Sequence, residues 1–166
     1  MQKPKVGVFM LSTLFYPTYI LLAIITILLF LPKQDIKNYF IYGLLFGGVG
    51  DIVIVALYQN VFHLISFKNA GIFNILGQNL LSSPSWVLTV IIYLHFLPNR
   101  QTFRYAYVLS FAALSVTYGY LVHNVDLFDF RPGFYPVFAY LSFLMWWTII
   151  TWVFVKTSSQ AQRNIS

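Results

Sequence analysis

The chain has 166 residues, of which 59% are hydrophobic and only 8% are charged, and its mean hydropathy is +0.74. A soluble domain carries about 25% charged residues because its surface faces water, so this composition excludes an ordinary water-soluble protein. The formal charge of +6 comes from single basic residues scattered between apolar runs, whereas a nucleic-acid-binding surface clusters them on one face. We therefore expect the lipid bilayer as a partner and no nucleic acid.

Several chemistries are absent from the sequence. Cysteine does not occur, which excludes disulfides, thiolate metal sites and thiol nucleophiles. Glutamate is also missing, so aspartate supplies all four side-chain carboxylates. No Gly-x-Ser-x-Gly, His-Glu-x-x-His, P-loop or Gly-x-Gly-x-x-Gly motif is present. We expect no cofactor and no metal, and an enzyme is the least favoured class.

Long stretches without lysine or arginine divide the chain. Each is long enough to cross a hydrocarbon core of about 30 Å as a helix with a rise of about 1.5 Å per residue. The pattern predicts one all-α domain over residues 1–166, a polytopic transmembrane helix bundle of about five spans. The spans are expected near residues 7–31, 39–62, 80–97, 104–122 and 135–155.

Asp51 lies near the middle of the second span. A carboxylate at this depth costs several kcal/mol unless it is paired, protonated or hydrated. Since no span contains a lysine or arginine in its interior, we expect Asp51 to be protonated or to bond neutral hydroxyl or ring partners. It is either a structural link between helices or a site for a proton, a cation or a ligand.

Three glycines precede Asp51 and favour close helix packing. Gly43, Gly47 and Asp51 recur every four residues, and Gly50 lies beside them. Small residues at this spacing let another backbone approach the helix. The stripe predicts contact with a neighbouring helix or with a second copy of the chain.

The start of the third span is irregular. Ser83 is predicted as the N-cap and Pro84 as the first helical residue. The segment from Pro84 to Leu97 is too short to cross a bilayer unaided. The stretch before it is expected to be an interfacial helix or the first half of a span broken near Pro84.

A polar cluster flanks the loop between the second and third spans. Its members are expected at one outer membrane face, where they either line a wet vestibule leading to Asp51 or are ordinary interfacial residues. The candidate site residues in this cluster are Gln59, Asn60, His63, Gln78 and Asn79, with Ser82, Ser83 and Ser85 beside them.

The remaining polar residues have simpler interpretations. His123, Asp126 and Asp129 are too few donors for an oxygen-rich cation site, and Asp129 is expected to pair with Arg131. His95 is predicted as a satisfied polar residue at the end of the third span.

Counting basic residues orients the chain. With five spans, four lysines and arginines lie on the side of the N-terminus and six on the opposite side, which predicts a cytoplasmic C-terminus. The first set is Lys3, Lys5, Lys68 and Arg131, and the second is Lys33, Lys37, Arg100, Arg104, Lys156 and Arg163.

Four segments carry a resemblance to a known family. They are Lys37-Asn38-Tyr39-Phe40, Gly50-Asp51, Tyr93-Leu94-His95-Phe96-Leu97-Pro98 and Arg131-Pro132-Gly133-Phe134-Tyr135. Over most of the chain after residue 30, this arrangement resembles a family of small uncharacterised multi-pass membrane proteins of Bacillus and related spore-forming Firmicutes. That family tends to carry Asp-Asn at this position, whereas Ile52 follows Asp51 here. The resemblance implies a bacterial plasma membrane and no particular activity.

Three function classes follow from the residues. The first is a non-enzymatic membrane protein that acts through helix packing, as a homo-oligomer or as an accessory subunit of a membrane-protein partner. The second is a small permeation or ligand-binding protein that uses Asp51 and the polar vestibule. The third is an enzyme on a lipid-soluble substrate, with Asp51 as proton donor, although no second acid or base accompanies it.

Overall fold

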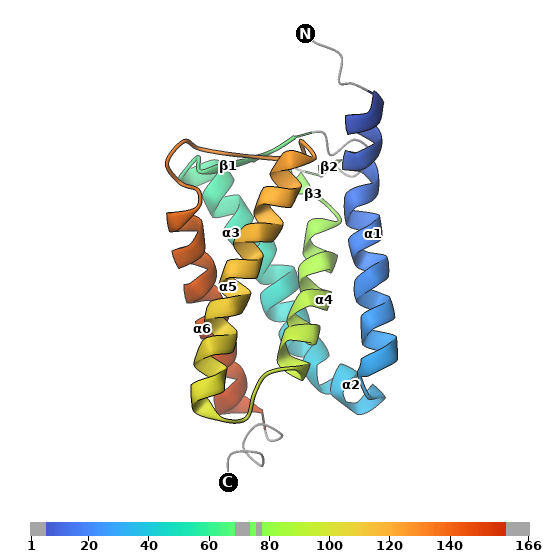
Figure 1. Cartoon of the computed structure of the whole chain (residues 1–166), viewed down its shortest axis with the longest axis vertical. Helices are drawn as coiled ribbons and strands as arrows, with labels where there is room; N and C mark the ends of the chain where they lie inside the picture. Colours follow the sequence, from blue (N-terminus) through green and yellow to red (C-terminus); the bar gives the residue numbers. More distant parts are fainter. Residues whose placement is uncertain (1–5, 69–73, 76–77, 159–166) are drawn as a thin grey trace.

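The computed structural model describes residues 6–68, 74–75 and 78–158 and shows a bundle of helices packed side by side (Figure 1). The long helices are α1 (Val6–Phe30), α5 (Gln101–Asn124) and α6 (Val137–Thr157). A shorter helix, α4 (Ser82–His95), lies among them. The all-α class predicted from the sequence is confirmed.

The second long helix runs without interruption from Lys33 to Val61 and alternates between two kinds of winding. Its parts are α2 (Lys33–Tyr42), a π-helical segment η1 (Gly43–Val49), α3 (Gly50–Ala56) and a second π-helical segment η2 (Leu57–Val61). π-Helical turns are rare and occur frequently at functional sites. Here the first of them ends at Val49, two residues before Asp51.

Short strand pairs connect the helices at one end of the bundle, the end where α1 begins (Figure 1). Strand β1 (Ile65–Phe67) pairs antiparallel with β4 (Phe128–Phe130), so that Ser66 lies opposite Asp129. Strand β2 (Asn74–Ile75) pairs antiparallel with β3 (Gln78–Asn79). The β1–β4 ribbon therefore ties the loop after η2 to the loop after α5.

Four helical segments are long and apolar enough to cross a membrane: Ser12–Phe30, Lys33–Val61, Gln101–Asn124 and Val137–Thr157. Their outer faces carry large apolar side chains with little protein around them; Leu28 and Leu29, for example, are each 72% exposed. Such a surface has no favourable solvent except lipid. The four helices support the sequence-based prediction of a membrane protein by their length and composition.

Helix α4 is the most deeply buried element although it has only 14 residues. At a rise of about 1.5 Å per residue it is about 21 Å long, less than the hydrocarbon core of about 30 Å. Val90 and Tyr93 have no exposed surface, and Ile91 and Leu94 are 2% exposed. The other helices surround α4, so its polar first turn contacts protein.

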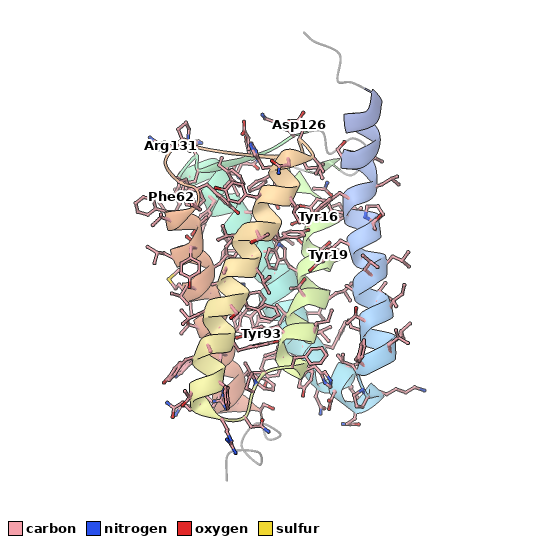
Figure 2. The ribbon with its side chains drawn as sticks, in the orientation of Figure 1. Tyr16, Tyr19, Phe62, Tyr93, Asp126 and Arg131 are labelled. Atoms are coloured by element: carbon pink, nitrogen blue, oxygen red, sulfur yellow. The ribbon has the colours of Figure 1, made fainter. Side chains whose placement is uncertain are left out.

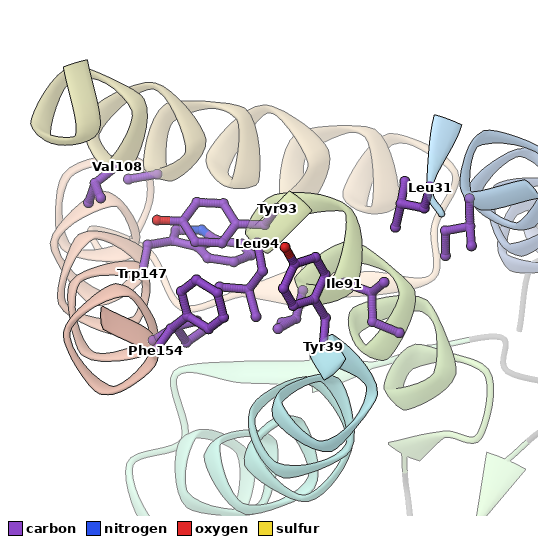
Figure 3. Close-up of a cluster of buried hydrophobic side chains, with 12 residues drawn as sticks. Leu31, Tyr39, Ile91, Tyr93, Leu94, Val108, Trp147 and Phe154 are labelled. Atoms are coloured by element: carbon purple, nitrogen blue, oxygen red, sulfur yellow. The ribbon is translucent and has the colours of Figure 1, made fainter. Parts of the chain in front are cut away.

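The largest core cluster joins α4 to α2, α5 and α6 (Figure 3). Trp147 of α6 is fully buried, its ring centroid lies 4.3 Å from that of Tyr93, and its indole N–H donates to Ser115 Oγ at 2.9 Å. The hydroxyl of Tyr93 bonds Thr151 of α6. These hydrogen bonds between uncharged groups satisfy polar atoms of the core that water does not reach.

Two predictions about the third span were wrong in detail. Helix α4 starts at Ser82 with Leu81 at its N-cap, so Ser83 is not the cap and Pro84 is the third helical residue. The preceding stretch is not a helix where it is described, because Asn74–Ile75 and Gln78–Asn79 pair as strands. The N-cap prediction requires the Ser83 hydroxyl to bond the backbone of its own helix. In the structure this hydroxyl bonds Asp51 instead.

Candidate functional site

Asp51 is in the first turn of α3 and faces the beginning of α4. Ser83 Oγ donates to Asp51 Oδ2 at 2.8 Å, and Ser82 Oγ donates to Oδ1 over a longer 3.5 Å. These are the neutral hydroxyl partners expected from the sequence. A carboxylate has about four acceptor sites, so two serine donors leave acceptor capacity for a further group.

The three glycines of the stripe lie against other helices of the same chain. A Cβ on Gly43 would lie 3.0 Å from Ile91 Cγ1, and one on Gly47 would overlap the backbone of Trp86, both in α4. A Cβ on Gly50 would lie 2.6 Å from the Trp146 ring of α6. The stripe is therefore filled within the molecule, and its close approach brings Asp51 to the serines.

A cavity of about 140 Å³ opens beside Asp51 between α3, α4, α5 and α6. More than half of its lining residues are aromatic, and Asp51 is the only one with a carboxylate or basic group. The aromatic lining consists of Tyr16, Phe46, Tyr58, Phe67, Trp86, Tyr118, Phe128, Phe130, Phe134, Tyr135, Phe143 and Trp146. The site is thus an aromatic chamber with one acid in its wall.

Two tyrosines approach the acid from helices that sequence reasoning did not connect to it. Tyr16 comes from α1 and is 4% exposed, and Tyr118 comes from α5; both line the cavity. Figure 2 shows Tyr16 and its neighbour Tyr19 on the side of α1 that faces the bundle. Tyr16 and Tyr118 line the cavity together with Ser82, which contacts Asp51. Neither tyrosine carries a recognisable sequence motif.

Of the predicted polar cluster, Ser82 and Ser83 reach Asp51, whereas the five residues farther from α4 do not line the cavity. None of Gln59, Asn60, His63, Gln78 and Asn79 lines the cavity. His63 is exposed at the turn after η2, with a φ of 50° and its Nδ1 3.0 Å from the carbonyl oxygen of Gln59. Asn79 is 4% exposed and accepts the backbone N–H of Leu81. His63 and Asn79 therefore shape turns at the end of the bundle.

The β1–β4 ribbon covers the end of the cavity, because Ile65, Phe67, Phe128 and Phe130 are among its lining residues. Lys68 Nζ lies 2.6 Å from Asp129 Oδ2 and joins the two strands. The sequence-based pairing of Asp129 with Arg131 was therefore wrong, since the antiparallel register brings Lys68 to Asp129. In the described part of the chain, no group of three His, Cys, Asp or Glu residues is placed to hold a metal.

The Lys68–Asp129 pair should hold the ribbon closed over a wide pH range. Lys68 lowers the pKa of Asp129, and Asp129 raises the pKa of Lys68. The stability that comes from the lowered pKa of Asp129 is lost as pH falls below the ordinary carboxyl range. The stability that comes from the raised pKa of Lys68 is lost as pH rises above the ordinary lysine range. We expect the intrinsic-rate-corrected amide protection of residues 65–67 to be constant between about pH 5 and pH 9.

The same amides provide the control for this pair. The two side chains are 45% and 40% exposed, so salt should screen their attraction. In the Lys68→Met variant the protection should fall and lose its salt dependence. Equal protection in the parent and Lys68→Met proteins would show that the pair does not hold the ribbon.

A histidine–carboxylate contact lies at the opposite end of the bundle. His95 Nδ1 of α4 is 3.1 Å from Asp35 Oδ2 of α2, and both side chains are largely buried. His95 is thus a satisfied polar residue at the end of the third predicted span, as expected from the sequence. The contact anchors the end of α4 to the start of the second long helix, away from the cavity.

Comparisons with known proteins found no relative of this chain. No protein-family model, no curated protein and no solved structure matches the chain.

Proposed function

We propose that this protein binds a small organic cation with an apolar body, such as a protonated amine, within the membrane bundle. The observation that carries the proposal is the single carboxylate of Asp51 in the wall of a chamber lined by aromatic rings. Aromatic faces attract cations by about 2 kcal/mol or more when the site is desolvated. A carboxylate with unused acceptor sites adds a charge-assisted hydrogen bond.

The volume of the chamber limits the size of the ligand. An engineered apolar cavity of about 150 Å³ accommodates benzene, and the chamber measures about 140 Å³. The enclosed part of the ligand is therefore about the size of one aromatic ring or a trimethylammonium group. The glycine stripe predicted contact with a neighbouring helix or with a second copy, and α4 and α6 of the same chain already fill it. The stripe therefore offers no surface to a second copy, which favours ligand binding over oligomerisation as the role of this region.

Asp51→Asn tests the proposal with two ligands of nearly equal shape. Benzylammonium carries a charge, and benzyl alcohol is its neutral counterpart. Because a hydrogen bond to a charged group contributes about 1.5–3 kcal/mol, Asp51→Asn should weaken benzylammonium binding about tenfold to a hundredfold. Binding of benzyl alcohol should change little. Isothermal titration of the protein in lipid nanodiscs at neutral pH measures both affinities.

Asp35→Asn is the matched control, since it neutralises a carboxylate at the opposite end of the bundle. It should leave both affinities unchanged. If the parent protein binds benzylammonium no more tightly than benzyl alcohol, or if Asp51→Asn binds both ligands like the parent, the cation site is not real.

The distribution of charge supports an orientation. Among the described residues, the end of the bundle that contains α2 has five basic residues and the single acid Asp35. The opposite end has two basic residues, Lys68 and Arg131, and two acids, Asp126 and Asp129. The basic residues at the α2 end are Lys33, Lys37, Arg100, Arg104 and Lys156.

We infer from this asymmetry that the α2 end and the C-terminus face the cytoplasm. In this arrangement α4 is a fifth, short span, and the bilayer is a bacterial plasma membrane, as the family resemblance implies. The ribbon-covered end of the chamber then faces the outside. Association with a second copy or with another membrane protein stays a prediction.

A further inference from the structure

One side of the aromatic chamber is not closed by protein. Of the described residues that line the chamber, Met145 of α6 is the most exposed, with 58% of its surface accessible. It belongs to a stripe of exposed apolar side chains along α6 that also includes Leu141 and Ile149. The chamber therefore opens at Met145, on a face of α6 that is covered by lipid.

This lateral opening lies between α6 and the second long helix. Within the described chain, α6 packs closely along α5, whereas its backbone contacts with α3 are sparse. Two side-chain contacts bridge the gap and frame it. On one side the Tyr58 hydroxyl donates to Ser142 Oγ at 2.8 Å, and on the other the rings of Phe46 and Trp146 meet edge to face with centroids 5.8 Å apart. Along the helix, Asp51 occurs between these two contacts.

The lateral opening is at the depth of the hydrocarbon. Met145 is near the middle of α6, and Asp51 is near the middle of the second long helix. The bilayer core has no water for a polar group that leaves the chamber, and an unsatisfied polar group there is costly. Any part of a ligand that extends through the opening is therefore apolar.

The charge of the chamber limits the head of such a ligand. Among the described residues of its lining, Asp51 supplies a carboxylate and none is a lysine, an arginine or a histidine. In an amine-bearing phospholipid, a phosphate lies close to the amine. Asp51 would repel that phosphate, and the lining offers no basic group to balance it. The lining thus favours an amine that carries no phosphate.

We propose that the chamber takes its ligand from the bilayer through the lateral opening, and that this ligand is a single-chain amphiphilic amine. Its ammonium group lies at Asp51 among the aromatic rings, and its hydrocarbon chain passes Met145 into the lipid. The volume of about 140 Å³ accommodates the head but not a long chain. This ligand class rests on the cation site proposed above and narrows it to lipid-soluble amines.

The hydrocarbon chain also concentrates the ligand where the opening lies. Each methylene group moved from water into lipid favours the membrane by a factor of about four. A chain of several carbons therefore places the amine almost entirely in the bilayer, beside α3 and α6. From there it need not cross the ribbon that covers the end of the chamber.

Met145→Trp tests the lateral opening with two ligands that share the same head. Benzylammonium fits inside the chamber, whereas the chain of N-dodecylbenzylammonium has to leave it. The larger ring at the opening should weaken binding of the dodecyl ligand about tenfold or more, because it obstructs the chain. Binding of benzylammonium should stay at the parent value, which also shows that the variant is folded. Isothermal titration in identical lipid nanodiscs measures both affinities, so that partitioning into lipid cancels between variant and parent.

Ile149→Trp is the matched control. Ile149 is one turn farther along the same exposed stripe of α6, but it does not line the chamber. This substitution should leave both affinities unchanged.

Photolabelling provides an independent measurement of where the chain lies. A diazirine on the dodecyl chain near the nitrogen should label residues 53–57 or 141–149, which flank the opening, and excess benzylammonium should remove this label. Label confined to other helices would overturn the lateral opening.

The titrations separate the lateral opening from the cation site. If the parent binds benzylammonium but not the dodecyl ligand, or if Met145→Trp binds the dodecyl ligand like the parent, the opening is refuted and the cation site stands. If Met145→Trp weakens binding of the dodecyl ligand but Asp51→Asn does not, the opening stands and the cation site is refuted. Competition by phosphatidylethanolamine in maltoside micelles would show that a phospholipid amine occupies the chamber, contrary to the proposed ligand class.

Discussion

Gly47→Ala should strongly destabilise the bundle, whereas Gly48→Ala should be nearly neutral. A Cβ at Gly47 would overlap the carbonyl group of Trp86 and the amide nitrogen of Val87, and this backbone lies in the most buried helix. The cost of such overpacking is about 1–3 kcal/mol. A Cβ at Gly48 would meet Val87 Cγ2 at 3.4 Å, an ordinary contact, and alanine gains up to about 1 kcal/mol in helix propensity.

The two glycines are consecutive in η1, so they form a matched pair for thermal unfolding in detergent. We expect a clear loss of melting temperature for Gly47→Ala only. Because the same contact brings Asp51 to α4, Gly47→Ala should also weaken benzylammonium binding. Equal melting temperatures for the two variants would contradict the close approach of the second helix to α4.

Trp147→Ala is expected to destabilise the bundle by about 3 kcal/mol. The side chain is fully buried, contacts the Tyr93 ring and donates to Ser115. Truncating a buried tryptophan in a soluble core costs about 3–5 kcal/mol. The low end applies here because lipid is as apolar as the side chain, so the loss is mainly one of packing and of one hydrogen bond.

Trp152→Ala is the control, because Trp152 is on the same helix but 62% exposed. Refolding equilibria in mixed detergent measure both free energies of unfolding. Trp152→Ala should change the free energy little compared with Trp147→Ala. If the two variants lose equal stability, α6 is not packed with Trp147 facing the core.

The helices could be predicted from the sequence because the bilayer imposes a simple rule. Apolar segments such as 104–122 and 135–155 have few charges over a length set by the hydrocarbon core, and they correspond to α5 and α6. Asp51 stood out for the same reason, as the one charged residue in its span. Its serine partners were expected only as a chemical class, since no local pattern ties residue 51 to residues 82 and 83.

The chamber could not be predicted, because its walls come from rings that are common in this chain. Tyr16 and Tyr118 are two of twelve tyrosines, and nothing in their local sequence separates them from rings that face lipid. The polar residues near the loop after the second span were more conspicuous, yet His63 and Asn79 serve turns. The Lys68–Asp129 pair depended on strand register, which short loop sequences do not specify.

The shortness and polar start of α4 bear on how the chain enters the membrane during synthesis. A 14-residue segment that begins Ser-Ser-Pro-Ser partitions poorly into lipid as an isolated helix, because serine and proline oppose insertion and the apolar stretch is too short. The segments that pack most closely against it, α1, α2 and η1, leave the ribosome earlier. Stable insertion of α4 therefore depends on helices that already lie in the bilayer, and the same segment synthesised without residues 1–62 should stay outside it.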